Sequence, residues 1–282
     1  MNIDYLKEWL GRTESRSDQI TLTPIAALSA TLDRDDVQPK AGDALPPLWH
    51  WLYFLPIYRQ SEVGPDGHPK RGGFLPPVPL PRRMWAGSRM QFHQPLRAGE
   101  TISRDSTIVD VSYKEGRTGP LVFVLVRHQI SNDAGVALTE EHDIVYRENP
   151  KPGDPQAKPQ AAPDDHAFSR EILPDDVLLF RYSALTFNGH RIHYDRRYVT
   201  EVEGYPGLVV HGPLIATLLM DLLRRNIADA KVASFTFRAV KPLFDIAPFS
   251  VCGKVEADGK TVKFWAKDAE GSLTMDATAI LA

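Results

Sequence analysis

The sequence lacks several features that would place it in a particular class. It has a single cysteine, Cys252, so no internal disulfide can form, and this favours a reducing compartment. No apolar run approaches the roughly 20 residues that a membrane-spanning helix needs. The formal net charge is only −3, without a long run of one sign, which argues against nucleic acid or an anionic membrane as the main partner.

Two groups of enzyme motif are also missing. Neither glycine-rich phosphate-binding pattern occurs, which counts against a nucleotide-dependent or NAD-dependent enzyme. There is no Gly-x-Ser-x-Gly, which counts against a serine hydrolase. The first residues, MNIDYLKEWLGR, are amphipathic and charged rather than typical of a signal peptide. We therefore expect a cytoplasmic protein.

The composition indicates a globular protein of two domains. The chain has 282 residues, 43% of them apolar and 24% charged, which suits one large or two small domains. Residues 149–164 are rich in proline, alanine and glutamine and offer few groups to bury, so they indicate a linker. The sequence thus predicts domains at residues 1–148 and 165–282.

Each predicted domain runs from helices to strands. In the first, residues 2–10 and 20–32 have helical character, and the aromatic-rich stretch from Pro46 or Pro47 to Pro56 predicts a central helix with His50 as a satisfied interior residue. Alternating strands follow from Trp85. In the second, a short helix starts at Pro174, and the apolar stretch 214–225 predicts a buried central helix followed by four strands.

A dense cluster of chemically active side chains precedes that second central helix. Its members fall within eight positions: Asn188, His190, Arg191, His193, Tyr194 and Asp195. Two histidines beside an amide and a carboxylate supply the parts for general acid/base catalysis. A metal site is the rival interpretation, but the pattern lacks the glutamate and the spacing of the helical zinc motif, so we predict none.

The helix that follows begins in a way that suits an anion. Pro213 fits the first helical position, and Gly212 lets another group approach the backbone closely. The unpaired N–H groups of such a helix end favour an oxyanion or a polarised carbonyl.

These residues carry a resemblance to a known family. The run from Asn188 to Asp195, followed by Val210-His211-Gly212, resembles the hydratase motif of the MaoC-like and FAS1-like dehydratases, in the itaconyl-CoA or mesaconyl-CoA hydratase branch. The resemblance implies an α+β double hotdog fold, two antiparallel sheets each wrapped around a central helix. It also implies a hydro-lyase whose catalytic histidine is His193 and whose oxyanion donor is Gly212. Asn188 stands where the family has the acid of its catalytic dyad.

The resemblance extends to the loop of residues 59–83. This segment contains six prolines and four glycines, which excludes regular structure, and GGFLPPVPLPRRMWAG looks like a segment of the same branch. We expect the loop to cover the thioester tunnel. Either Arg82 or Arg83 would then meet a phosphate or a carboxylate, the alternative being a solvated arginine pair.

Two mechanisms fit the cluster. In the favoured one, His193 moves the proton at the α-carbon of an acyl thioester, Asn188 orients the water and the Gly212 N–H holds the enolate oxygen. In the other, Asp195 partners a histidine and His190 is a second acid or base; Asp195 alternatively caps the next helical turn. Rival functions are a thioesterase that uses Asp195 or Glu201, a non-catalytic acyl-thioester-binding protein, and a 3-hydroxyacyl-ACP dehydratase.

The expected substrate follows from the arginines near the cluster. Arg181, Arg191, Arg196 and Arg197 flank it, and guanidinium groups bind carboxylates in two-pronged geometry. We expect a short branched dicarboxylic acyl-CoA, bound with the help of Tyr194 as well, and no cofactor beyond the coenzyme A of the substrate. The alternative is that these arginines pair with surface acids such as Asp176 and Glu201. We also expect self-association into a homo-oligomer, although no residue pattern supports it.

Overall fold

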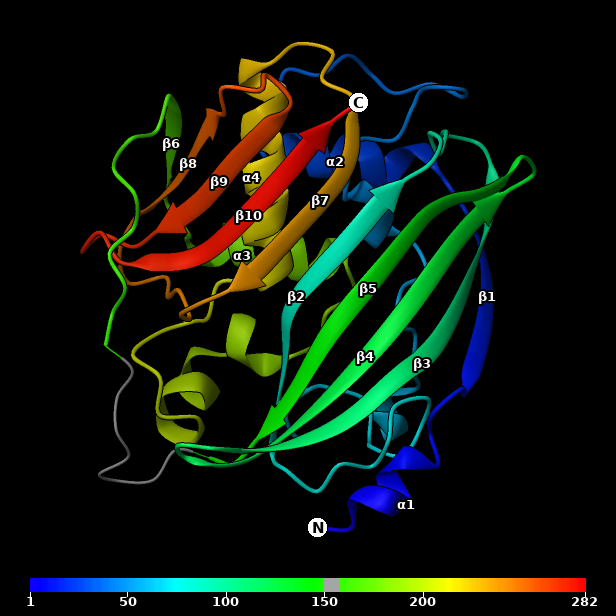
Figure 1. Ribbon diagram of the computed structural model, residues 1–282, viewed down its shortest axis with the longest axis vertical. Coiled ribbons are helices and arrows are strands. Elements are labelled where there is room, and N and C mark those ends of the chain that lie inside the picture. Colours follow the sequence, from blue (N-terminus) through cyan, green and yellow to red (C-terminus); the bar gives the residue numbers. More distant parts are fainter. Residues whose placement is uncertain (150–157) are drawn as a thin grey trace.

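The computed structural model describes residues 1–149 and 158–282, and its strands form one curved antiparallel sheet (Figure 1). The strand order is β1-β3-β4-β5-β2-β7-β10-β9-β8-β6. The first half consists of β1 (Thr13–Gln19), β2 (Arg82–Phe92), β3 (Thr101–Gly116), β4 (Gly119–Asn132) and β5 (Gly135–Arg147). The second half consists of β6 (Phe168–Ile172), β7 (Val232–Ala239), β8 (Phe249–Val255), β9 (Thr261–Lys267) and β10 (Leu273–Leu281).

The two halves repeat one topology and meet in the middle of the sheet. From outer edge to centre, each half places its first, third, fourth, fifth and second strand. The second strands, β2 and β7, pair with each other from Gly87↔Arg238 to Gln91↔Ser234. This confirms the predicted side-by-side arrangement of two sheets. Half of the predicted linker, residues 150–157, lies outside the described residues.

The second half is built on α4 (Gly212–Asn226), as predicted. Every residue from Leu214 to Leu223 is buried, and the helix packs against β6, β8, β9 and β10. Full burial of a leucine side chain contributes about 1.5–3 kcal/mol, so this helix anchors the core. In Figure 1 it lies behind β7–β10.

The last turns of α4 hold a buried carboxylate that ties three elements together. Asp221 is only 2% exposed and accepts hydrogen bonds from Arg34, Arg170 and Arg225 at 2.6, 3.1 and 2.7 Å. Arg34 follows α2 (Leu22–Thr31) and Arg170 lies on β6. Buried charges persist where they are paired in this way, so the end of α4 is fixed against both halves.

The predicted central helix of the first half is wrong. Within residues 46–56 only Trp49–Leu52 (η1) forms a 3-10 turn. Leu48 and Phe54 adopt left-handed backbone conformations, with φ of 71° and 55°, and so interrupt any longer helix. The inner face of the first half is covered instead by α2 and by the aromatic side chains around η1.

The remaining short helices agree with the sequence. They are α1 (Ile3–Lys7) and α3 (Asp176–Leu185), and Asp175 caps the latter through the N–H of Leu178. Further turns are η2 (Gln60–Glu62), η3 (Arg191–His193) and η4 (Tyr198–Val202), the last being π-helical. None of the helices in the described ranges is long and apolar enough to cross a membrane.

A buried polar network lies under η1 in the first half. Glu140, on β5, is 2% exposed and accepts hydrogen bonds from Trp51 Nε1 at 3.1 Å and from His50 Nε2 at 2.9 Å. Although burial acts to raise it, the charges and hydrogen bonds of His142 and His50 hold the pKa of Glu140 well below its usual range. His50 is therefore the satisfied interior residue that the sequence predicted.

Glu140→Ala should lower the free energy of unfolding by about 3–5 kcal/mol, because His50 and Trp51 lose a buried acceptor. Urea denaturation measures this difference. The matched control is Glu141→Ala on the same strand, whose side chain pairs at the surface with Arg89 and Arg127 and should cost about 0–1 kcal/mol. Equal losses in the two variants would contradict the proposed stabilising role of the network.

Candidate active site

His193 is held in one tautomer by the backbone. It ends η3, is 8% exposed, and its Nδ1 donates to the carbonyl oxygen of Val209 at 2.7 Å. The N–H of Val209 donates in turn to the carbonyl of Ile192 at 2.9 Å, so the turn and the extended segment lock each other. Burial lowers the pKa of His193 to about 4. At neutral pH its Nε2 therefore carries a free lone pair and can act as a base.

His211 packs against the ring of His193. The two rings stack with centroids 3.7 Å apart and planes inclined by 17°. His211 caps α4, is 1% exposed, and shares a hydrogen bond of 2.8 Å with Ser183 of α3. Burial and the neighbouring His193 hold the pKa of His211 well below its usual value. His211 was not predicted as a site residue, although its place beside Gly212 pointed to the site.

Two more imidazoles extend the pair into a row of four rings. His190 meets His193 edge-on with ring centroids 5.5 Å apart, and His68 lies over His190 at 3.9 Å. Burial, together with His68 and His193, lowers the pKa of His190 to about 2. Burial also lowers the pKa of His68, against the opposing effect of Asp66. All four rings are thus neutral at physiological pH.

The loop of residues 59–83 brings His68 to the site. The carbonyl of Asp66 accepts the N–H of Arg191 at 2.9 Å, and the carbonyl of Pro65 accepts Arg191 Nη1 at 2.9 Å. Gly67 adopts φ +88° and lies so close to Gly189 that a Cβ on Gly67 would sit 1.8 Å from its carbonyl oxygen. The predicted loop therefore lies directly against the cluster of residues 188–195.

Asn188 and Gly212 have N–H groups that can donate hydrogen bonds to a ligand. The Oδ1 of Asn188 accepts the N–H of His190 at 3.0 Å, so only its Nδ2 amide protons are free, and they make no hydrogen bond within the described residues. Gly212 opens α4, and a Cβ built on it would meet no atom within 4 Å. A ligand oxygen can approach this helix end closely.

Three other predicted residues stabilise the turn of residues 188–195. Asp195 accepts the N–H of Tyr198 at 3.0 Å and pairs with Arg191 at 2.8 Å, so it caps the next helical turn, as the alternative interpretation proposed. Arg191 also lies over the Tyr198 ring at 4.2 Å. Tyr194 is exposed and donates to the carbonyl of Gly189 at 2.9 Å.

The predicted arginines divide into engaged and unpaired groups. Arg82 donates to Tyr205 Oη at 2.6 Å and pairs with Glu203 at 3.1 Å. Arg83 makes no ion pair within residues 1–149 and 158–282, and its charge contributes to the lowered pKa values of His68 and His190. Arg181 lies apart, on the exposed face of α3, where it lines a hollow with Ala27 and Thr31 of α2. Arg196 and Arg197 pair with Asp176, Asp245 and Glu201.

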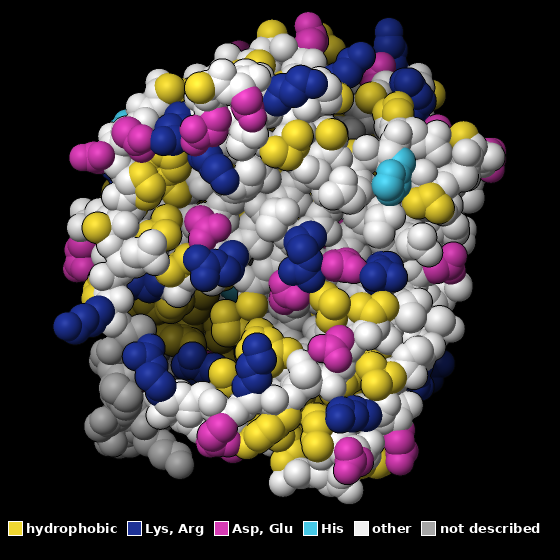
Figure 2. All heavy atoms as spheres, viewed as in Figure 1, with side chains coloured by type: hydrophobic (Ala, Val, Ile, Leu, Met, Phe, Trp, Pro, Cys, Tyr) yellow, Lys and Arg dark blue, Asp and Glu magenta, His cyan; other side chains and the backbone are white. Residues whose placement is uncertain are grey.

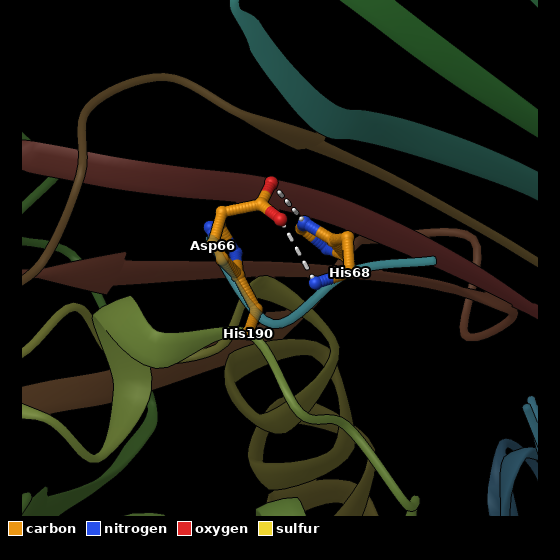
Figure 3. Close-up of side chains that lie close together, drawn as sticks. All are labelled: Asp66, His68 and His190. Atoms are coloured by element: carbon orange, nitrogen blue, oxygen red, sulfur yellow. Dashed lines mark hydrogen bonds and ion pairs between the residues drawn. The ribbon is translucent and has the colours of Figure 1, made fainter. Parts of the chain in front are cut away.

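One group of side chains has the composition of a metal site. Asp66, His68 and His190 each offer a ligand atom, all within 4.8 Å of one another (Figure 3). With Zn–N bonds of about 2.1 Å, two imidazoles on one tetrahedral ion have centroids about 5 Å apart. The rings of His68 and His190 are closer, with centroids 3.9 Å apart and planes inclined by 39°. The arrangement suits ring packing better than shared coordination.

Figure 2 shows a hollow on the face of the molecule seen in Figure 1. It is lined with hydrophobic side chains and bordered by several Lys and Arg side chains. It lies below the C-terminal end of β7 in this view. An apolar hollow with a basic rim has the character of a site for an apolar chain that carries phosphates or carboxylates.

Comparison with known proteins assigns the family. The model of the hydroxyacyl-thioester dehydratase type 2 family matches residues 48–245. The chain belongs to this family. It is a hydro-lyase of the hydratase and dehydratase type, as its sequence predicted. A mesaconyl-C(4)-CoA hydratase from Chloroflexus aurantiacus is 48% identical over 273 residues, covering 96% of this chain and 95% of that protein.

Solved structures support the double hotdog fold. A MaoC-like dehydratase from Phytophthora capsici superimposes with a TM-score of 0.70 at 15% identity, covering 100% of this chain and 99% of that chain. A Mycobacterium tuberculosis protein described as having a double hotdog fold gives a TM-score of 0.59 at 14% identity, covering 97% and 96%. The predicted fold is thus confirmed.

The NMR resonances of the His193 ring should not titrate between about pH 8 and pH 5.5, whereas the titration of an unperturbed histidine has its midpoint at about pH 6.5. The reason is that burial lowers the pKa of His193 to about 4. A His193→Ala variant identifies the resonance by its disappearance. A midpoint close to that of a model peptide would show that the ring is solvated and not held as described.

Proposed function

We propose that this protein adds water to a short branched dicarboxylic enoyl-CoA of the mesaconyl or itaconyl type, or removes it in the reverse direction. The observation that supports this most strongly is the neutral His193, with its Nε2 lone pair available, beside the open helix end at Gly212. The family assignment and the similarity to a mesaconyl-C(4)-CoA hydratase support the same chemistry.

The residues supply each part of the reaction. The water oxygen bonds to the β-carbon while one of its protons passes to Nε2 of His193, and the electron pair of the double bond moves to the thioester oxygen. The N–H of Gly212 at the start of α4 holds that developing oxyanion. His193 then returns the proton to the α-carbon and is neutral again. The free amide of Asn188 orients the water.

The dicarboxylic acyl group is inferred from one arginine. Arg191, Arg196 and Arg197 already have acidic partners at the surface, so they do not form the surplus of free guanidinium groups that the sequence suggested. Arg83, whose charge lowers the pKa values of His68 and His190, makes no ion pair with a carboxylate among the described residues. A substrate carboxylate would provide the missing partner.

A hydration assay across crotonyl-CoA, itaconyl-CoA and mesaconyl-CoA tests both parts. We expect the dicarboxylic substrates to react faster, and His193→Ala to lower turnover by about 10²–10⁴-fold without unfolding the protein. His93→Ala, at an exposed position on the first half, is the control and should leave turnover unchanged. Near-full activity of His193→Ala would refute the assignment of the base.

Arg83→Gln should raise KM for the dicarboxylic substrates and leave that for crotonyl-CoA nearly unchanged, since only the former lose an ion pair. The ratio of kcat/KM between mesaconyl-CoA and crotonyl-CoA measures this selectivity. An unchanged ratio, or faster reaction of crotonyl-CoA with the wild type, would remove the case for a carboxylate-binding arginine. Reaction only with acyl-carrier-protein thioesters would instead support the dehydratase alternative.

A further inference from the structure

The proposed hydration needs a second hydrogen-bond acceptor for the reacting water, which Asn188 of the 188–195 cluster does not supply. A water molecule has two O–H donors and two lone pairs. When one O–H points at His193 Nε2 and one lone pair points at the β-carbon, the amide of Asn188 satisfies the second lone pair. The second O–H still needs an acceptor. Asn188 cannot provide it, because its Oδ1 already accepts the N–H of His190.

The ring of His68 lies two imidazoles along from the base, with its centroid 3.9 Å from that of His190, which in turn lies 5.5 Å from that of His193. Nδ1 of His68 lies 3.2 Å from Oδ2 of Asp66, while its backbone N–H donates to Oδ1 of the same carboxylate at 3.0 Å. In Figure 3 dashed lines join the two carboxylate oxygens of Asp66 to these two nitrogens, and His190 lies beside Asp66. A carboxylate accepts only, so Nδ1 of His68 carries the proton and Nε2 presents a lone pair. His68 and His193 thus have the same tautomer.

We propose that His68, oriented by Asp66, is the second hydrogen-bond acceptor for the reacting water and takes the part that Asn188 cannot play. This inference rests on the proposed hydration. His68 touches the water and is a catalytic residue, whereas Asp66 acts through His68 and is a positioning residue. The active site is then composite, because the base belongs to the second half and the second acceptor to a loop of the first.

The neighbouring groups favour this role. The ring of His68 packs against that of His190 with planes inclined by 39°, and His68 is close enough to His193 that a proton on it would lower the pKa of His193. Although partial burial acts to raise it, the side-chain and backbone hydrogen bonds from His68 hold the pKa of Asp66 far below its usual value, so the carboxylate is ionised. The carboxylate therefore holds His68 in the accepting tautomer throughout the neutral range.

The substitution Asp66→Asn separates orientation from folding. The asparagine oxygen can keep the bond from the His68 backbone N–H, which turns the amide NH₂ towards Nδ1. Nδ1 must then accept, and the proton moves to Nε2, which becomes a donor. We expect kcat to fall by about 10²-fold or more with KM changed less than about threefold, the loss typical of a positioned acid/base group.

Three companion measurements complete the test. His68→Gln should lose a similar factor, and the double variant should lose no more than His68→Gln alone, because the two residues act as one unit. Nitrogen-15 NMR of the imidazoles should show the His68 proton on Nδ1 in the wild type and on Nε2 in Asp66→Asn. Glu62→Gln removes a carboxylate from the same loop, where its side chain accepts the N–H of Arg59, and should retain full activity.

The outcomes are distinct. Wild-type turnover in Asp66→Asn, additive losses in the double variant, or an unchanged tautomer would each overturn the proposal. Activity that is abolished by a chelator and restored by zinc would also overturn it, because Asp66, His68 and His190 would then be metal ligands. If the wild type hydrates none of the thioesters, the proposed function fails, and that result is separate from any effect of these variants.

Discussion

The pairing of β2 with β7 is the constraint on which the site depends. The two strands pair through five residue pairs, from Gly87↔Arg238 to Gln91↔Ser234, and so join two five-stranded halves into one sheet. Arg82 and Arg83, the first two residues of β2, are also the last two of the proline-rich loop of residues 59–83. Because the sheet fixes where β2 begins, it fixes where the loop returns, and this places Asp66 against Arg191.

The two halves share a topology but have diverged in what they bury. The second half retains a long apolar helix whose N-terminal end opens at Gly212, and it presents His193 to that end. The first half fills its inner face with aromatic side chains and the carboxylate of Glu140. It contributes to the chemistry through a loop instead of through its core. A duplicated fold has thus become one site with unequal contributions.

The sequence predicted the parts whose signals are local. The helix α4, the long strands and the 188–195 turn follow from periodicity and spacing within short windows. The edge strands β1 and β6 were missed because TESRSDQ and FSREI lack the apolar alternation of inner strands. The helix predicted near Trp49 failed because the left-handed backbone of Leu48 and Phe54 has no signature in side chains of that type. His68 was missed because His190 and His193, the imidazoles that its ring joins in the site, are more than 100 positions away.

A glycine-to-alanine comparison within the loop tests the composite site most directly. Gly67 and Gly72 have similar φ angles, +88° and +93°, but a Cβ collides with Gly189 only at Gly67, whereas at Gly72 it meets no atom within 4 Å. The measurement is kcat for hydration of mesaconyl-CoA by both alanine variants. If the loop completes the site, Gly67→Ala should displace His68 and lose about 10²-fold in kcat, while Gly72→Ala should keep most of its activity. Equal turnover by the two variants would contradict a site shared between the halves.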